Sequence, residues 1–212
     1  MHDENCLNSL MDFFSKLKVN EKVCARFGEE GFVPEVHFMN FHTYLDRATC
    51  WESVSNWKTV VTYVIQSGDD HLYVRDTERG QSSEIFTHHE GDNIYGTCVP
   101  ANIPFTVHRF TEIPYVLSTN LRNYKWVIVE SKRTFVYRSA SSAWSFTCSV
   151  TWEGESKHVA ETSERKFCIL VESEDTSKFT GNLNYGCASL CEKIIDVMGR
   201  SEEASLKFTA IN

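Results

Sequence analysis

The sequence has no apolar run near the roughly 20 residues that a membrane-spanning helix requires. Its start, Met1-His2-Asp3-Glu4-Asn5, is acidic rather than basic, so we expect no secretory signal peptide. Hydrophobic residues make up 42% and charged residues 24% of the chain, which excludes disordered and collagen-like proteins. The length of 212 residues predicts a single domain over residues 1–212 and no membrane partner.

The sequence also lacks the short motifs of several common enzyme classes. It contains no Gly-x-x-x-x-Gly-Lys-Ser/Thr loop, no Gly-x-Gly-x-x-Gly turn and no Gly-x-Ser-x-Gly elbow. Positive charge is scarce as well, since 21 Lys and Arg stand against 29 Asp and Glu for a net charge of −8. This balance argues against a general nucleic-acid coat, although it leaves room for a local basic cavity.

Eight cysteines are present, with no Cys-x-x-Cys pair. Without an expected signal peptide, we interpret them as free thiols in a reducing intracellular compartment, the nucleus or the cytoplasm. Cys187 and Cys191 are four residues apart in a helical pattern, which favours one helix face over a metal site. Cys24, Cys148 and Cys168 lie in apolar, strand-like runs and are predicted to be small core or tunnel residues.

Apolar periodicity predicts an α+β protein. Helical spacing is found at residues 3–18, 36–47 and 184–198. The strand candidates are short segments rich in Val, Tyr and Thr, at residues 22–28, 59–65, 72–76, 83–87, 105–110, 115–119, 125–130, 134–138, 145–152 and 166–172. Such a series of strands predicts an antiparallel barrel or sandwich with the helices packed outside. The polar tail after residue 199 is predicted to be mobile.

Alternation along residues 166–175 places Cys168, Leu170, Glu172 and Glu174 on one face of a strand. Two carboxylates on one face can hold a hard divalent cation through their oxygens. The other interpretation is an acidic, solvated strand end, and we favour it on the sequence alone.

His88 and His89 are the only adjacent histidines in the sequence. Neighbouring residues of a strand point to opposite faces, so the two side chains cannot easily bind the same ion. We interpret the pair as a solvated strand end.

Five basic residues lie in or beside predicted strands: Arg26, Arg75, Lys132, Arg133 and Arg138. If several of them point into a barrel, they form an anion-binding tunnel, because guanidinium groups bind phosphate in a bidentate manner. The alternative is ordinary charge on the barrel exterior, which is favoured for any one of them.

The segments Arg26-Phe27-Gly28 and Gly31-Phe32-Val33-Pro34-Glu35-Val36 resemble the metal-dependent RNA 5′-triphosphatases of fungi, protozoa and large DNA viruses, which are triphosphate tunnel metalloenzymes. Further segments match in order: Thr62-Tyr63, Val74-Arg75-Asp76, Ser131-Lys132-Arg133-Thr134-Phe135, Trp144-Ser145-Phe146 and Phe167–Glu172. The resemblance covers residues of about 20–175 and implies an eight-stranded antiparallel β-barrel with helices packed outside.

The resemblance also implies roles for individual residues. The basic positions of the family fall on Arg26, Arg75, Lys132 and Arg133, which makes these the expected phosphate-binding residues. The metal, Mn or Mg in an active member, is left with Glu172, joined by Glu174 if the strand register shifts by two.

The chain departs from the family at the metal-binding positions. Glutamates expected on the first and last strands are replaced at four positions: Lys22, Cys24, Cys168 and Leu170. Basic and acidic positions of a further strand carry hydroxyls, at Ser145, Thr147 and Ser149. One or two remaining carboxylates cannot form a tight site for a hard cation, so no catalytic residue is assigned and no cofactor is expected.

These departures favour a non-catalytic tunnel-fold protein, a pseudoenzyme that serves as a binding or scaffold subunit in transcription or mRNA capping and processing. The resemblance extends to two subunits of the Mediator head, which share the fold without catalysis. The expected partner is another protein or a 5′-phosphorylated RNA end. Two alternatives remain: an active RNA 5′-triphosphatase that uses Glu172 and Glu174 with Arg75, Lys132 and Arg133, and an unrelated β-barrel binding protein.

Overall fold

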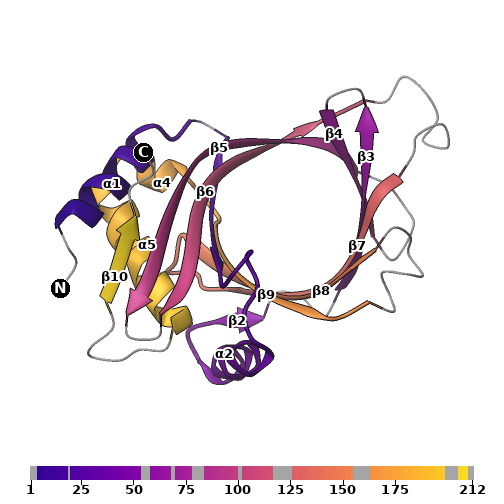
Figure 1. Ribbon diagram of the computed structural model, residues 1–212. Coiled ribbons are helices and arrows are strands. Elements are labelled where there is room, and N and C mark those ends of the chain that lie inside the picture. The colour runs from indigo at the N-terminus through magenta and orange to yellow at the C-terminus, as the bar shows by residue number, and fades with distance from the viewer. Residues whose placement is uncertain are drawn as a thin grey trace.

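The computed structural model describes residues 4–18, 20–53, 58–67, 70–77, 84–99, 102–116, 126–154, 163–198 and 205–209. Eight long strands form its main body: β1 (Lys22–Phe27), β3 (Lys58–Ser67), β4 (Asp70–Thr77), β5 (Glu84–Val99), β6 (Ile103–Pro114), β7 (Trp126–Arg138), β8 (Trp144–Gly154) and β9 (Lys166–Ser173). They pair antiparallel in the order β5-β4-β3-β7-β8-β9-β1-β6, and β6 pairs back with β5. The sheet is therefore a closed barrel, seen along its axis in Figure 1, and the predicted fold class is confirmed.

Two further strands lie beside the barrel. β2 (Glu52–Ser53) pairs with the end of β7, and β10 (Ser205–Thr209) pairs with the second half of β5. The prediction of a mobile tail is therefore wrong for β10, and residues 199–204 lie outside the described part of the chain.

Strand boundaries differ from the predictions at three places. Residues 126–138 form one continuous strand, although the polar stretch Ser131-Lys132-Arg133 suggested a break. β5 continues to Val99. The polar residues from Glu90 to Asn93 resemble a turn, but they form a bulge within the strand instead of ending it. Tyr115 and Val116 are not in a strand, and the rest of the predicted strand at 115–119 lies outside the described residues.

The helices pack on the outside of the barrel (Figure 1). In the described part of the chain they are α1 (Glu4–Ser15), α2 (Glu35–Arg47), α4 (Ser177–Thr180) and α5 (Leu183–Met198), and of these α4 was not predicted. Cys187 and Cys191 are both buried on α5, as expected for one apolar face. In the described part of the chain, no helix combines the length and apolarity that crossing a membrane would need.

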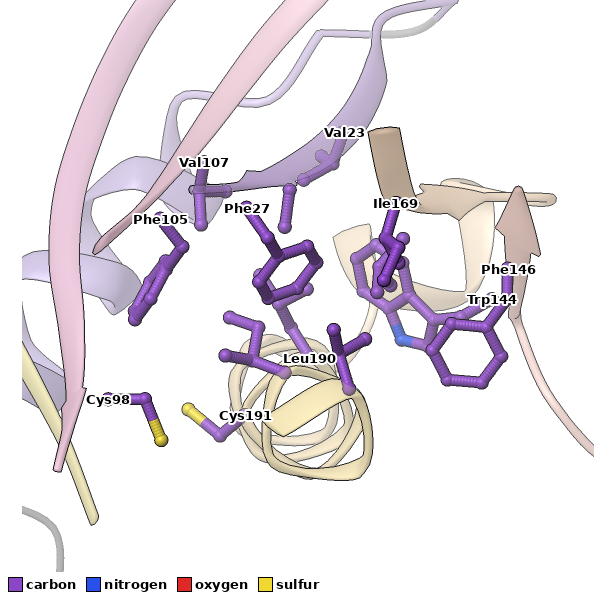
Figure 2. Close-up of a cluster of buried hydrophobic side chains, with 14 of the residues drawn as sticks. Val23, Phe27, Cys98, Phe105, Val107, Trp144, Phe146, Ile169, Leu190 and Cys191 are labelled. Atoms are coloured by element: carbon purple, nitrogen blue, oxygen red, sulfur yellow. The ribbon is translucent and has the colours of Figure 1, made fainter. Parts of the chain in front are cut away.

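The main hydrophobic core lies between the barrel and the helices, as Figure 2 shows. Alternate side chains of β1, such as Val23 and Phe27, point out of the barrel toward Leu190 of α5. Phe146 of β8 belongs to the same core and is 0% exposed. The side chains on the outer face of the barrel wall therefore form the hydrophobic core.

The turn after β1 requires glycine. Gly28 has a φ of 87°, and a Cβ atom there would lie 1.7 Å from the carbonyl oxygen of Phe32. Only glycine tolerates both the left-handed conformation and this approach. The turn leads the chain through Pro34 into α2, which buries Phe38, Phe41 and Leu45.

Candidate functional site

The inner face of the barrel, which we call the lumen, is identified by alternation along the strands. Because Val23 and Phe27 face the helices, Cys24 and Arg26 between them face inward. Residues directly opposite each other on paired strands face the same side. Cys24 is opposite His108 on β6 and Glu172 on β9, so these two residues also face inward.

The wall where the resemblance requires metal-binding carboxylates is apolar. Cys24, Phe110, Cys168 and Leu170 form one buried cluster, with Phe32 packed against it. Burial raises the pKa of both Cys24 and Cys168, so these thiols stay neutral at pH 7. The side chains of this cluster themselves offer no oxygen ligand of the kind that Mn or Mg prefers.

The two remaining candidate carboxylates have different protein partners. Glu172 accepts a 2.6 Å hydrogen bond from the Thr147 hydroxyl in the lumen. Glu174 lies just beyond the end of β9 and forms a 2.9 Å ion pair with Nε of Arg138. Within the described residues, no three His, Cys, Asp or Glu side chains are placed to hold a metal ion together. The residues present therefore do not fit a hard divalent cation.

Two of the predicted phosphate-binding residues are in the lumen but already have carboxylate partners. Arg75 pairs with Glu112 at 2.7 Å and with Glu84 at 3.5 Å. Lys132 pairs with Glu130 at 3.0 Å. Burial, the largest single influence, would lower the pKa of Lys132, but favourable interactions with Glu130 and Cys168 together outweigh it and raise that pKa, so Lys132 remains charged.

Arg26 has a different environment. Its guanidinium hydrogen-bonds to the Cys24 thiol, which is a neutral partner. Arg26 also lines a cavity together with Asn93 of β5 and His108 of β6, and its charge acts on Lys132 as well as on His108. Among the described residues Arg26 has no carboxylate within ion-pair distance, unlike Arg75 and Lys132, although the charge of Glu130 helps to raise its pKa.

Arg133 lies on the opposite face from Lys132. Its opposite residue on β8 is Val150, which packs against the exterior core, and the Arg133 side chain is exposed. The structure therefore separates Arg133 from Arg26, Arg75 and Lys132, contrary to the grouping expected from the sequence.

One side of the lumen is lined by rings, which we call the aromatic wall: Tyr73, Phe86, His88, His108 and Phe110. Tyr73 and Phe86 stack with centroids 5.5 Å apart, and His88 meets Phe110 edge-on at 4.9 Å. The Arg75 guanidinium lies 4.4 Å from the centre of the Phe86 ring. Strands β4, β5 and β6 contribute these residues.

The two histidines of this wall are uncharged at pH 7. Burial, followed by the charge of Arg26, lowers the pKa of His108 to about 3. Burial also lowers the pKa of His88. His88 is half-buried in the lumen whereas His89 is exposed, so the expectation of opposite faces is confirmed and that of a solvated end is wrong for His88.

The facing side of the lumen carries hydroxyls, which we call the hydroxyl row: Ser145, Thr147, Ser149 and Thr151, all on β8 and all buried. Thr147 donates to Glu172, as described above. Ser149 Oγ and Thr151 Oγ1 are buried and have no hydrogen-bond partner among the described residues. Sequence reasoning identified Ser145, Thr147 and Ser149 only as losses of charged residues, and it did not single out Thr151.

A cavity of about 270 Å³ opens at one end of the lumen. It is lined by Arg26, Gly28, Glu30, Gly31, Glu90, Asn93, Tyr95, Thr106 and His108. The cavity therefore connects the glycine turn after β1 with the Arg26 side chain and the start of the aromatic wall.

Comparison with solved structures gives the same architecture. The S. pombe Pct1 RNA triphosphatase aligns with a TM-score of 0.74 at 8% identity, over 94% of this chain and 95% of that one. The same protein in complex with the Spt5 CTD aligns at 0.71 and 9% identity, over 95% and 96% of the two chains. The Mimivirus capping enzyme triphosphatase aligns at 0.60 and 12% identity, over 93% and 99%. At such identities the likeness establishes the fold.

No protein-family model matches the sequence, and no curated protein matches it.

Proposed function

We propose that this protein is a non-catalytic relative of the RNA 5′-triphosphatases that acts as a binding or scaffold subunit in transcription or in mRNA capping and processing. One observation carries the proposal: the lumen wall that needs carboxylates for a metal is instead the apolar cluster of Cys24, Phe110, Cys168 and Leu170. Without a metal, the developing charge of a phosphoryl-transfer transition state lacks its main stabiliser.

The similar structures support the choice of process. Both Pct1 and the Mimivirus protein are named as RNA triphosphatases, and Pct1 has been solved with the Spt5 CTD. We therefore infer a protein partner in a transcription or RNA-processing assembly, and a 5′-phosphorylated RNA end as a further ligand. Arg26, Arg75 and Lys132 are the phosphate-binding residues that we assign to the lumen.

Free thiols support a reducing compartment, the nucleus or the cytoplasm. Seven of the cysteines are free thiols: Cys24, Cys50, Cys98, Cys148, Cys168, Cys187 and Cys191. Several of them, such as Cys24 and Cys148, are fully buried in the barrel wall. Buried reduced cysteines are typical of intracellular proteins.

A phosphate-release assay tests the proposal. The protein is incubated with RNA that carries a γ-labelled 5′-triphosphate, with Mn or Mg, and released phosphate is measured. We expect no release above the rate of a protein-free control. A metal-dependent release that disappears in the Glu172→Ala/Glu174→Ala variant would overturn the proposal and establish the active triphosphatase instead.

A matched gain-of-site variant sharpens this test. Lys22→Glu, Cys24→Glu and Leu170→Glu together restore carboxylates to the positions that the resemblance assigns to the metal. We expect tight Mn binding in a titration of the triple variant and none in the native chain. Equal Mn affinity in the two proteins would contradict the argument that the apolar cluster removed the metal site.

A further inference from the structure

The lumen has two unlike walls, and this contrast is not explained by the loss of a metal alone. The aromatic wall presents rings from β4, β5 and β6, of which both histidines are neutral. The hydroxyl row on β8 faces it with small polar groups. Neutral rings offer a triphosphate no opposite charge, whereas nucleic-acid bases stack on such a surface.

Several buried polar atoms of the lumen also lack hydrogen-bond partners among the described residues. They are Ser149 Oγ and Thr151 Oγ1 on the hydroxyl row, His88 Nε2 on the aromatic wall and Asn93 Oδ1 in the cavity at the lumen end. Ser149 is 0% exposed and Thr151 is 1% exposed. Buried polar groups are nearly always hydrogen-bonded in folded proteins, so an additional molecule is expected to satisfy these.

The charges of the lumen side chains limit how much negative charge a bound molecule can have. Arg75 and Lys132 are already neutralised by glutamates, and an anion would have to displace those carboxylates. Arg26 hydrogen-bonds to the neutral Cys24 thiol, feels the charge of Glu130 without an ion pair to it among the described residues, and lines the cavity beside His108. The lumen therefore suits a ligand with one compact anionic group near Arg26, rather than an extended polyphosphate.

We propose that the lumen binds a nucleotide, with its base against the aromatic wall and its phosphate at Arg26. Base stacking on neutral rings uses the aromatic wall, and the heterocycle and sugar hydroxyls supply partners for the unpaired groups. The ligand enters through the cavity at the glycine turn, where Arg26 and His108 both contribute to the lining. This inference rests on the proposed function and specifies the ligand of the same lumen.

Binding measured by calorimetry, with a chelator present to exclude metals, tests the inference. The probes are four nucleoside monophosphates, adenosine, inorganic tripolyphosphate and a short RNA with a 5′-monophosphate. We expect at least one nucleoside monophosphate to bind about tenfold more tightly than tripolyphosphate, because stacking adds to the phosphate contact. Binding of the RNA but of no free nucleotide identifies an RNA end as the source of the ligand, and the reverse identifies a free nucleotide.

Four variants separate the two parts of the proposed site. Phe110→Leu removes a ring from the aromatic wall but keeps an apolar side chain, and it should weaken nucleotide binding about tenfold while leaving tripolyphosphate unaffected. Arg26→Gln should weaken the binding of nucleotides but not of adenosine. The matched controls are Phe135→Leu and Arg133→Gln, which change the same residue types on the outer side of β7 and should leave all affinities unchanged.

Circular dichroism checks that each variant is folded, and His88→Leu replaces Phe110→Leu if the latter does not fold. The inference is overturned if neither a free nucleotide nor the RNA end binds better than tripolyphosphate, or if the exterior variants weaken binding as much as the lumen variants. Absence of nucleotide binding together with absence of phosphate release rejects only this inference and leaves a scaffold role. Phosphate release together with the expected nucleotide binding rejects only the non-catalytic function.

Discussion

The two faces of strand β8 have opposite chemistry. Trp144, Phe146 and Cys148 point outward into the core under the helices, whereas Ser145 and Thr147 between them point into the lumen. The outward residues are packed and at most 1% exposed, and the inward ones are small and polar. Alternate side chains of one strand thus serve different purposes: the outward ones stabilise the fold and the inward ones are available to a ligand. Substitutions in the lumen can therefore remove a metal site without destabilising the barrel.

The largest loss of stability is expected from a substitution on the outer face of β8. Phe146 packs edge-on against Trp51 at 4.6 Å and Phe41 at 5.1 Å, so Phe146→Ala leaves a cavity and should lower the free energy of unfolding by about 3–5 kcal/mol. Thr147→Val, its inward neighbour, should cost less, about 1.5–3 kcal/mol, through the lost bond to the Glu172 carboxylate. Urea unfolding of both variants measures the difference, and equal losses would contradict the division between the two faces.

A smaller effect should appear in the pH dependence of stability. The pKa of His108 falls from 6.5 to about 3 on folding, so the unfolded chain binds more protons between these values and stability decreases as the pH falls below 6.5. One such group contributes about 1.4 kcal/mol per pH unit in this range. His108→Gln should flatten the slope of unfolding free energy between about pH 6 and pH 5.

His89→Gln is the control for this measurement, because His89 is adjacent to the lumen residue His88 but exposed on the outside. It should leave the slope unchanged. A wild-type protein whose unfolding free energy is flat over the same pH range would show that His108 is not held neutral in the lumen.

The smallest effect is expected at the hydroxyl row. Ser149 is fully buried without a hydrogen-bond partner among the described residues, so Ser149→Ala removes no bond and should change stability by less than about 0.5 kcal/mol. Ser173 is a buried serine whose hydroxyl accepts the Val23 amide at 2.9 Å, and Ser173→Ala should cost about 1–3 kcal/mol. A comparable loss from both substitutions in urea unfolding would show that Ser149 has a partner.

The fold could be predicted from the sequence because its signals are local. Helical spacing located α1, α2 and α5, and alternation placed Cys168, Leu170 and Glu172 correctly on one face. Alternation would also have separated Lys132 from Arg133, but the sequence analysis grouped them as neighbours in a motif. The structure places their side chains on opposite sides of the barrel wall.

The site could be predicted only in part, because closure of the barrel brings together residues that are distant in the sequence. Arg75 meets Glu112 across 37 positions, and no spacing rule indicates that this carboxylate neutralises it. Phe86-x-His88 and His108-x-Phe110 do show the alternation of a lumen face, and this was the available signal for the aromatic wall. Neutrality of the histidines depends on burial and on Arg26, which only the folded structure reveals.

Closure of the barrel also limits how a protein partner can bind. Each of the eight barrel strands pairs with a strand on both sides, and β10 covers the part of β5 that extends beyond β4. A peptide that recognises its target by β-augmentation needs an unpaired backbone edge, which the barrel strands do not offer along these paired segments. Along these paired segments, a protein partner must therefore contact side chains, so specificity there depends on residue identity rather than on backbone complementarity.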